Sequence, residues 1–157
     1  MSERRFPGLA WEMVLYLQAK TPMAEDGKKI LFLCVGNTCR SQMAEGLARL
    51  HGKGRFEIRS AGTNAMGYVN ADTAGAMLEA GVDISAQSSK QLTYEMLDWA
   101  DIIVTLGCGR AQSLCPAVNS AEKHDWPIED PLGRPPEVMR RVRDDMERRV
   151  KELLDGK

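Results

Sequence analysis

The sequence predicts an α/β fold in which helices flank a small parallel sheet. Two short apolar runs, Lys29–Leu33 and Asp101–Leu106, have the length and composition of buried strands. Segments with helical patterns alternate with these strands, which is typical of βαβ units and of a parallel sheet. A glycine-containing loop follows the first strand, at the strand end where such sheets bind their ligands.

The first half of the chain shows these elements in order. The strand at Lys29–Leu33 leads into a helix at Ser41–Leu50, and Arg55–Arg59 alternates as a second strand that ends at Ser60–Gly62. Either Asn70 or Asp72 can cap the next helix. That helix runs to Ala80, and Gly81 is a good stop signal.

The second half begins with a polar loop from Ser85 to Lys90. Thr93 is typical of a helix cap and predicts a short helix at Tyr94–Trp99, before the strand at Asp101–Leu106. A long loop follows from Gly107 to Pro131, and loops of this length are usually functional or mobile. Apolar residues at every fourth position then predict an amphipathic helix from Pro135 to Asp155.

We expect two regions, an N-terminal extension at 1–27 and one catalytic domain at 28–157. The extension carries a short helical stripe from Leu9 to Leu17, which Thr21-Pro22 interrupts. Three interpretations stay open: a docking or dimerisation helix, a poorly ordered tail, or a start assigned too early with Met23 as the initiator.

Composition narrows the function classes. The chain has 157 residues, 43% apolar and 27% charged, with a net charge of −1. These values favour a globular domain and give no global field that would recruit nucleic acid or a membrane. The longest apolar runs are too short to span a bilayer, and we expect a cytoplasmic protein. In that compartment its four cysteines are more typical of catalysis or metal binding than of disulfides.

The loop from Cys34 to Ser41 predicts an oxyanion site with a nucleophile. At the start of a helix, free backbone N–H groups and the positive end of the helix dipole favour a bound anion and a thiolate. A lone cysteine at the end of an apolar strand, such as Cys34, is more often a small core residue than a nucleophile, but the strand–loop–helix context favours thiolate attack. The expected oxyanion-binding residues are Val35, Gly36, Asn37, Thr38, Cys39, Arg40 and Ser41. A packed thiol that supports the loop is the preferred interpretation of Cys39.

Two further groups of residues lie in the long loop. Cys108 and Cys115 are seven positions apart, which fits a redox pair better than zinc, because no Cys-x-x-Cys is present. Asp130, in Glu129-Asp130-Pro131, is a candidate proton donor for a leaving oxygen, although Asp-Pro is also a common turn.

These motifs together resemble the low molecular weight tyrosine phosphatases and the arsenate reductases built on the same fold. The resemblance rests on the loop from Cys34 to Gly46, Ser60-Ala-Gly62, the strand before Gly107 and Glu129-Asp130-Pro131. It covers residues 28 to about 152 and implies a three-layer sandwich with about four parallel strands.

Within this family, the downstream cysteines resemble those of thioredoxin-coupled arsenate reductases. The resemblance implies that arsenate binds in the loop, with phosphate as competitor, and that Cys34, Arg40 and Asp130 act on it. Cys108 and then Cys115 would pass the oxidation on to thioredoxin, although glutaredoxin or a small thiol could replace it. Gly107 is a departure, because it shifts Cys108 by one position.

No cofactor or metal is expected. Some family members hold potassium, and Asn37, Glu45 and Ser60 match its ligands, but Lys90 lies where a further carboxylate is expected. Its ammonium group could fill the same electrostatic role. Two other functions stay open, a phosphotyrosine or phosphomonoester phosphatase and a non-enzymatic thiol redox sensor.

Overall fold

A four-stranded parallel sheet forms the centre of the protein. The computed structural model describes residues 27–107 and 121–156. The strand order is β2-β1-β3-β4, and all three pairings are parallel. The strands are β1 (Lys29–Cys34), β2 (Glu57–Gly62), β3 (Ile102–Leu106) and β4 (Glu122–Trp126). The predicted α/β class and the small parallel sheet are therefore confirmed.

The register brings the carboxyl ends of the strands together. Cys34, at the end of β1, lies opposite Gly62 of β2, and Leu106 of β3 lies opposite Trp126 of β4. The segments that follow the four strands therefore start from the same edge of the sheet, as expected for a ligand site in a parallel sheet.

The central strand β1 is buried on both faces. Ile30 and Phe32 belong to the core between the sheet and the larger helices, whereas Leu31 and Leu33 belong to a smaller core on the other face. This alternation follows from the two-residue period of a strand. A strand covered on both faces is apolar throughout, which explains the continuous apolar run that predicted it.

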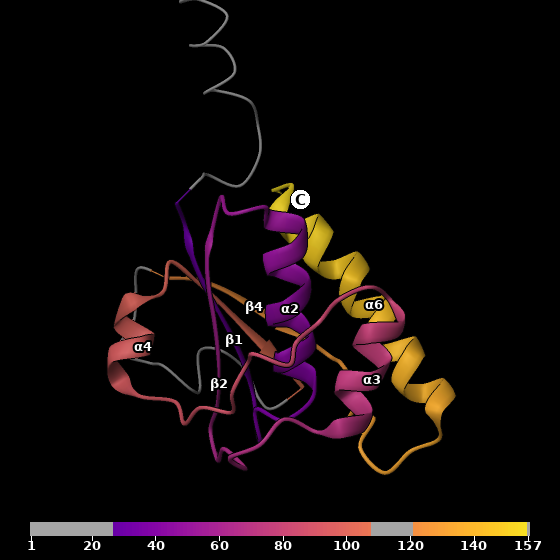
Figure 1. Ribbon diagram of the computed structural model, residues 1–157. Helices are drawn as coiled ribbons and strands as arrows, with labels where there is room; N and C mark the ends of the chain where they lie inside the picture. Colours follow the sequence, from indigo (N-terminus) through magenta and orange to yellow (C-terminus); the bar gives the residue numbers. More distant parts are fainter. Residues whose placement is uncertain (1–26, 108–120, 157) are drawn as a thin grey trace, which may run out of the picture.

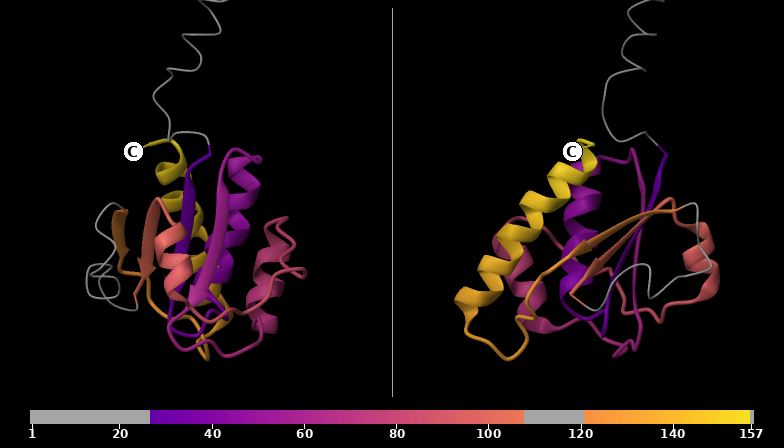
Figure 2. Two further views of the ribbon diagram at one scale, coloured as in Figure 1. Left: turned by 90° about the vertical axis from the view of Figure 1, so that its left-hand side faces the viewer. Right: turned by 180° about the vertical axis from the view of Figure 1, so that it is seen from behind.

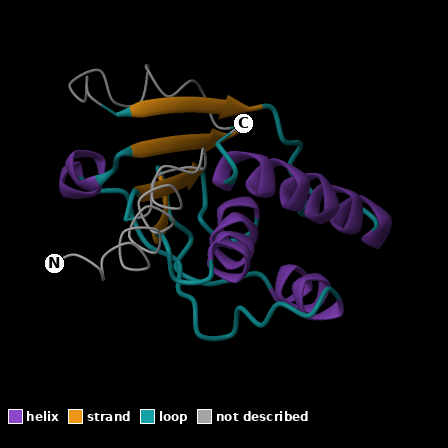
Figure 3. Cartoon of the chain, turned by 90° about the horizontal axis from the view of Figure 1, so that it is seen from above, coloured by secondary structure: helices purple, strands orange, loops and turns teal. Residues whose placement is uncertain are grey.

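Helices cover the two faces unequally. On one face lie α2 (Arg40–Gly52), α3 (Ala71–Glu79) and α6 (Pro136–Leu154), with α2 packed against both β1 and α6. The short α4 (Tyr94–Trp99) covers the other face, where Leu97 joins the smaller core. Figures 1, 2 and 3 show these layers. The three-layer sandwich is as predicted.

Helix caps agree with the sequence signals. The side chain of Asn70 accepts a hydrogen bond from the Thr73 amide at the start of α3, and the hydroxyl of Thr93 accepts one from the Met96 amide at the start of α4. Gly81 follows α3 with φ of 82°, in the left-handed region that favours glycine. These elements begin and end within one or two residues of their predicted bounds.

The last helix, α6, has 19 residues, is the longest helix of the described ranges and is amphipathic. Its inner face buries Val142, Met146 and Val150, and its outer face is rich in arginine and acidic residues. No helix in the part of the chain that the structure describes is long and apolar enough to cross a bilayer.

Two predictions about the sheet need correction. The stretch from Gly107 to Pro131 is not loop throughout, because Glu122–Trp126 forms the edge strand β4. Four of its five residues are polar or charged, and only Trp126 is buried, so the strand lacks an apolar pattern. The second strand also begins at Glu57 rather than Arg55 and continues to Gly62. The predicted helical stripe within 1–27 lies outside the described residues.

Candidate active site

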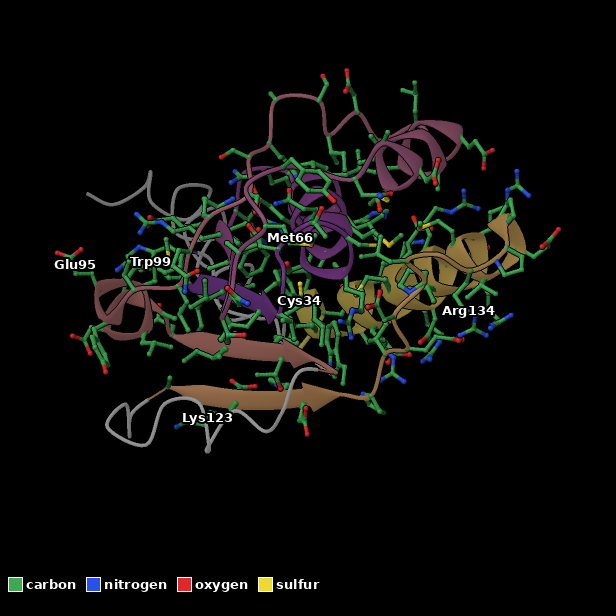
Figure 4. The ribbon with its side chains drawn as sticks, turned by 90° about the horizontal axis from the view of Figure 1, so that it is seen from below. Cys34, Met66, Glu95, Trp99, Lys123 and Arg134 are labelled. Carbon is green, nitrogen blue, oxygen red and sulfur yellow. The ribbon has the colours of Figure 1, made fainter. Side chains whose placement is uncertain are left out.

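The loop between β1 and α2 occupies the edge at which the strands end. Cys34 is the last residue of β1 and Arg40 is the first residue of α2, so the loop spans both ends of the predicted anion site. Figure 4 shows Cys34 at the tip of β1, with Met66 beside it on the segment that follows β2.

Carbonyl groups of the loop bond to the segment after β2. The carbonyl oxygens of Val35, Gly36 and Thr38 accept hydrogen bonds of 2.8–3.0 Å from the amides of Asn64, Met66 and Asn70. In these bonds the loop supplies only acceptors. The N–H groups of the loop take no part in these bonds, and N–H groups at the start of a helix favour a bound anion.

The side chain of Asn37 fixes the shape of the loop. Its backbone φ of 48° is left-handed, a region that asparagine tolerates better than most residues. Its Oδ1 accepts from the backbone N–H of Lys90 at 2.7 Å, which sets the orientation of the amide. Its Nδ2 then donates to the hydroxyl groups of Ser41 at 2.6 Å and Ser60 at 3.0 Å.

This network ends at the Cys34 sulfur. The Ser41 hydroxyl lies 2.9 Å from Cys34 Sγ, and both side chains are buried. Because Ser41 already accepts from Asn37, its own proton is free to point at the sulfur. A hydrogen bond in that direction stabilises a thiolate, as does the N-terminus of α2.

The other end of the network is a buried carboxylate. Glu45 is 4% exposed; its Oε1 accepts from the Ser60 hydroxyl at 2.5 Å, and its Oε2 accepts from Arg49 at 3.0 Å. The ammonium group of Lys90 lies 3.5 Å from Oε1. Lys90 therefore places a positive charge near Glu45 and Ser60, where the resemblance pointed to a cation.

Arg40 lies between the loop and the ends of β3 and β4. Its Nη1 donates to the carbonyl oxygens of Leu106 at 2.8 Å and Ile128 at 3.2 Å. Its Nη2 lies 3.8 Å from the carboxylate of Asp130, whose side chain is 52% exposed. The other Asp130 oxygen accepts from the backbone N–H of Leu132. Asp130 therefore lies at the mouth of the site with its carboxylate directed at Arg40.

A pocket of about 300 Å³ lies between these groups. Cys34, Arg40 and Asp130 line it together. It has room for a tetrahedral oxyanion, and the Arg40 guanidinium supplies the positive charge that an anion needs. A second cavity, of about 400 Å³, lies between α3 and α6 and has no cysteine among the described residues that line it. Four charged residues line it, and two of them, Glu79 and Arg140, are paired with each other. We therefore assign the chemistry to the smaller pocket.

Comparison with known proteins agrees with this fold. Residues 29–156 match the model of the low molecular weight phosphotyrosine protein phosphatase family. The chain belongs to this family.

Relatives within the phosphatase family include reductases. The chain is 45% identical to an arsenate reductase of Halalkalibacterium halodurans over 82% of its own length and 96% of the relative's. A solved arsenate reductase in the phosphate binding state superposes with a TM-score of 0.74 at 38% identity, covering 81% of this chain and 96% of that one. An arginine phosphatase of Geobacillus stearothermophilus has a TM-score of 0.72 at 30% identity, covering 81% and 90%.

The residues predicted for the site fall into three groups in this phosphatase-family fold. Most line the pocket, namely Cys34, Val35, Gly36, Thr38, Cys39, Arg40 and Asp130. Asn37 and Ser41 are fully buried and act on the loop through the network described above. Cys108 and Cys115 lie outside the described residues.

Cys39 has the properties of a packed thiol. It is 2% exposed, and its sulfur lies 3.8 Å from the sulfur of Met139 on α6. Burial, as the main cause, raises the pKa of the Cys39 thiol to about 12. The thiol thus stays protonated at neutral pH and is a poor nucleophile, unlike a thiolate at the helix N-terminus.

Three pocket residues were not predicted. Asn64 and Met66 follow β2, and Leu132 follows Asp130. Asn64 and Met66 could have been predicted from the sequence, because they come directly after a strand that ends at the same edge of the sheet as Cys34. The hydroxyl of Thr38 also stands out, since it is buried and has no hydrogen-bond partner among the residues that the structure describes. In the same residues, no group of three or more potential ligands could hold a metal ion.

Proposed function

We propose that this protein reduces arsenate to arsenite with electrons from a dithiol protein. The observation that carries the proposal is a pocket that Cys34, Arg40 and Asp130 line together, in a chain 45% identical to an arsenate reductase. Arsenate is tetrahedral and close to phosphate in size, so phosphate is expected to compete.

Binding uses the loop and one guanidinium group. Backbone N–H groups from Val35 to Arg40 hold the oxygens, and Arg40 supplies the positive charge that a bidentate clamp needs. The contacts of Arg40 with two carbonyl oxygens support this role, because they hold the guanidinium at the edge of the pocket.

The first chemical step forms a sulfur–arsenic bond. The Cys34 thiolate attacks arsenic, and one oxygen leaves as water after it receives a proton from Asp130. The position of Asp130 at the pocket mouth supports this assignment. Arsenic is still in its +5 state at this point.

The second step reduces arsenic and needs two more thiols. The Cys108 thiolate attacks the Cys34 sulfur, a Cys34–Cys108 disulfide forms, and the sulfur–arsenic electron pair moves to arsenic, which leaves as arsenite. Cys115 then attacks Cys108 and releases Cys34 as a thiolate, leaving a Cys108–Cys115 disulfide. Seven-residue spacing in one segment and the sequence resemblance support this relay.

An external dithiol must reduce the final disulfide. Thioredoxin is the reductant we propose, because its low reduction potential suits a protein disulfide. A relay of this kind works only where thiols are kept reduced, so we also propose a cytoplasmic location.

The test is arsenate-dependent NADPH consumption in the presence of thioredoxin and thioredoxin reductase. We expect turnover with the full chain, and none with Cys34→Ser or Cys108→Ser. Ser113→Ala, in the same segment as the two cysteines, is the matched control and should retain turnover. Absence of arsenate-dependent consumption by the full chain would overturn the proposal.

A phosphatase is the second candidate, because the family model and the arginine phosphatase structure both point to phosphate transfer. It requires Cys34, Arg40 and Asp130 but not Cys108. Hydrolysis of p-nitrophenyl phosphate that survives Cys108→Ser, with no arsenate turnover in the full chain, would favour it.

A further inference from the structure

Gly107 is the residue directly after β3, and its backbone meets two parts of the site. A Cβ atom built on Gly107 would lie 2.4 Å from the carbonyl oxygen of Ile128 and 2.7 Å from Nη1 of Arg40. Both distances are far shorter than van der Waals contact, and the nearer one is to backbone, which yields less easily than a side chain.

The backbone conformation adds a second reason for glycine. Gly107 has φ of 81°, where side-chain-bearing residues are disfavoured. Six other glycines of the described chain share a positive φ. For Gly81, with φ of 82°, nothing lies within 4 Å of an added Cβ. Only Gly107 combines the conformation with contacts to Arg40.

The space beside Gly107 is where Arg40 is held. Nη1 of Arg40 bonds there to the carbonyl oxygens of Leu106 and Ile128 at 2.8 and 3.2 Å. Ile128 is two residues before Asp130, whose carboxylate lies 3.8 Å from the same guanidinium group. The contacts beside Gly107 therefore position both the Arg40 guanidinium and the segment that carries Asp130.

We propose that Gly107 is a positioning residue that lets Arg40 and Asp130 reach the pocket together. This inference rests on the oxyanion site proposed above, and it concerns binding and orientation rather than the cysteine relay. A side chain at position 107 displaces either the Ile128 carbonyl or the guanidinium group. Either displacement weakens the hold on an anion in front of Cys34.

Two measurements that need no arsenate turnover test this inference. The first is the affinity for inorganic phosphate by titration calorimetry. The second is the rate of Cys34 alkylation by anionic iodoacetate relative to neutral iodoacetamide, followed by mass spectrometry of the Cys34 peptide. A well-placed guanidinium next to the sulfur favours the anionic reagent.

We expect Gly107→Ala to raise the phosphate dissociation constant about tenfold, the size of one lost charge-assisted hydrogen bond. It should also lower the ratio of the two alkylation rates toward that of Arg40→Ala. Gly81→Ala is the matched control, because it carries the same backbone strain without the contacts. It should lose thermal stability through the strain alone, and therefore less than Gly107→Ala, and it should leave both measurements within about twofold.

Gly107→Asn keeps the test usable if the alanine variant unfolds, because asparagine tolerates positive φ but still carries a Cβ. A folded Gly107 variant could show wild-type phosphate affinity and a wild-type alkylation ratio while Arg40→Ala loses both. That result would overturn the inference about Gly107 and leave the proposed oxyanion site standing. If Arg40→Ala also behaves as wild type, the proposed oxyanion site itself is wrong.

Discussion

The side-chain amide of Asn37 donates a 2.6 Å hydrogen bond to the hydroxyl of Ser41. Because Ser41 accepts from Asn37, its own proton is free to point at the Cys34 sulfur 2.9 Å away. A hydrogen bond in that direction favours the thiolate.

Ser41→Ala should therefore slow the reaction of Cys34 at neutral pH. A hydrogen bond to a charged group is worth about 1.5–3 kcal/mol, so we expect alkylation by iodoacetamide to slow at least about tenfold. Ser85→Ala, at an exposed serine, is the control and should react at the wild-type rate. An unchanged rate in Ser41→Ala would mean that the helix N-terminus alone stabilises the thiolate.

Lys90→Met should destabilise the fold. The change removes a positive charge from Glu45, whose side chain is 5% exposed, and leaves Arg49 as its one remaining cationic partner among the described residues. Because Lys90 is itself 30% exposed, we expect a loss of only about 1–2 kcal/mol in the free energy of unfolding by urea denaturation.

Two other variants calibrate that measurement. Lys90→Arg keeps the charge and should lose less. Lys123→Met removes an ammonium group that donates to the backbone carbonyl of Ala121, and it should stay within about 0.5 kcal/mol of wild type. Equal stability of Lys90→Met and wild type would show that Arg49 suffices to neutralise Glu45.

Local signals and long-range contacts differ in how well the sequence predicted them. The loop from Cys34 to Ser41 and the cap at Asn70 depend on residues close in the chain, and both were found. The contacts of Arg40 with Leu106 and Ile128 join residues 66 and 88 positions apart, which only the sheet brings together. No spacing rule could predict that the space beside Gly107 is occupied.

The missed strand has a different physical cause. An edge strand pairs on one side only, and charged residues there discourage pairing with another chain. The β4 sequence, with Glu122, Lys123 and Asp125, therefore gives no apolar signal. Pairing with β3 through the backbone, together with the packing of Trp126 against Phe32, defines the strand instead.

Thr38→Val should separate stability from anion binding. The Thr38 hydroxyl is buried without a partner in the described residues, which costs free energy, so the valine variant should be as stable as wild type or more stable by about 1 kcal/mol. Because Thr38 lines the pocket, the hydroxyl is available to a bound oxyanion. We expect phosphate affinity to fall about fivefold by calorimetry, the size of one neutral hydrogen bond. Thr38→Ser, which keeps the hydroxyl, should bind within about twofold of wild type.

Cys39 should be inert under conditions in which Cys34 reacts. With a pKa raised to about 12 by burial, only about one Cys39 thiol in ten thousand is ionised at pH 8. Short treatment of the folded protein with iodoacetamide at pH 8 should therefore modify Cys34 and leave Cys39 unmodified, as peptide mass spectrometry can show. Modification of both residues at similar rates would contradict the burial argument.

The same pKa predicts how stability changes in alkali. An unfolded cysteine ionises near pH 9.0, whereas folded Cys39 keeps its proton to about pH 12. Between these values the unfolded state binds fewer protons, so the free energy of unfolding falls as pH rises. The effect is complete near pH 12 and absent below about pH 8. Cys39→Ala removes this titration, and its unfolding free energy should fall less steeply than that of wild type between pH 9 and pH 11. If the free energy of unfolding fell equally with pH in wild type and Cys39→Ala, the Cys39 thiol would not be buried in the folded protein.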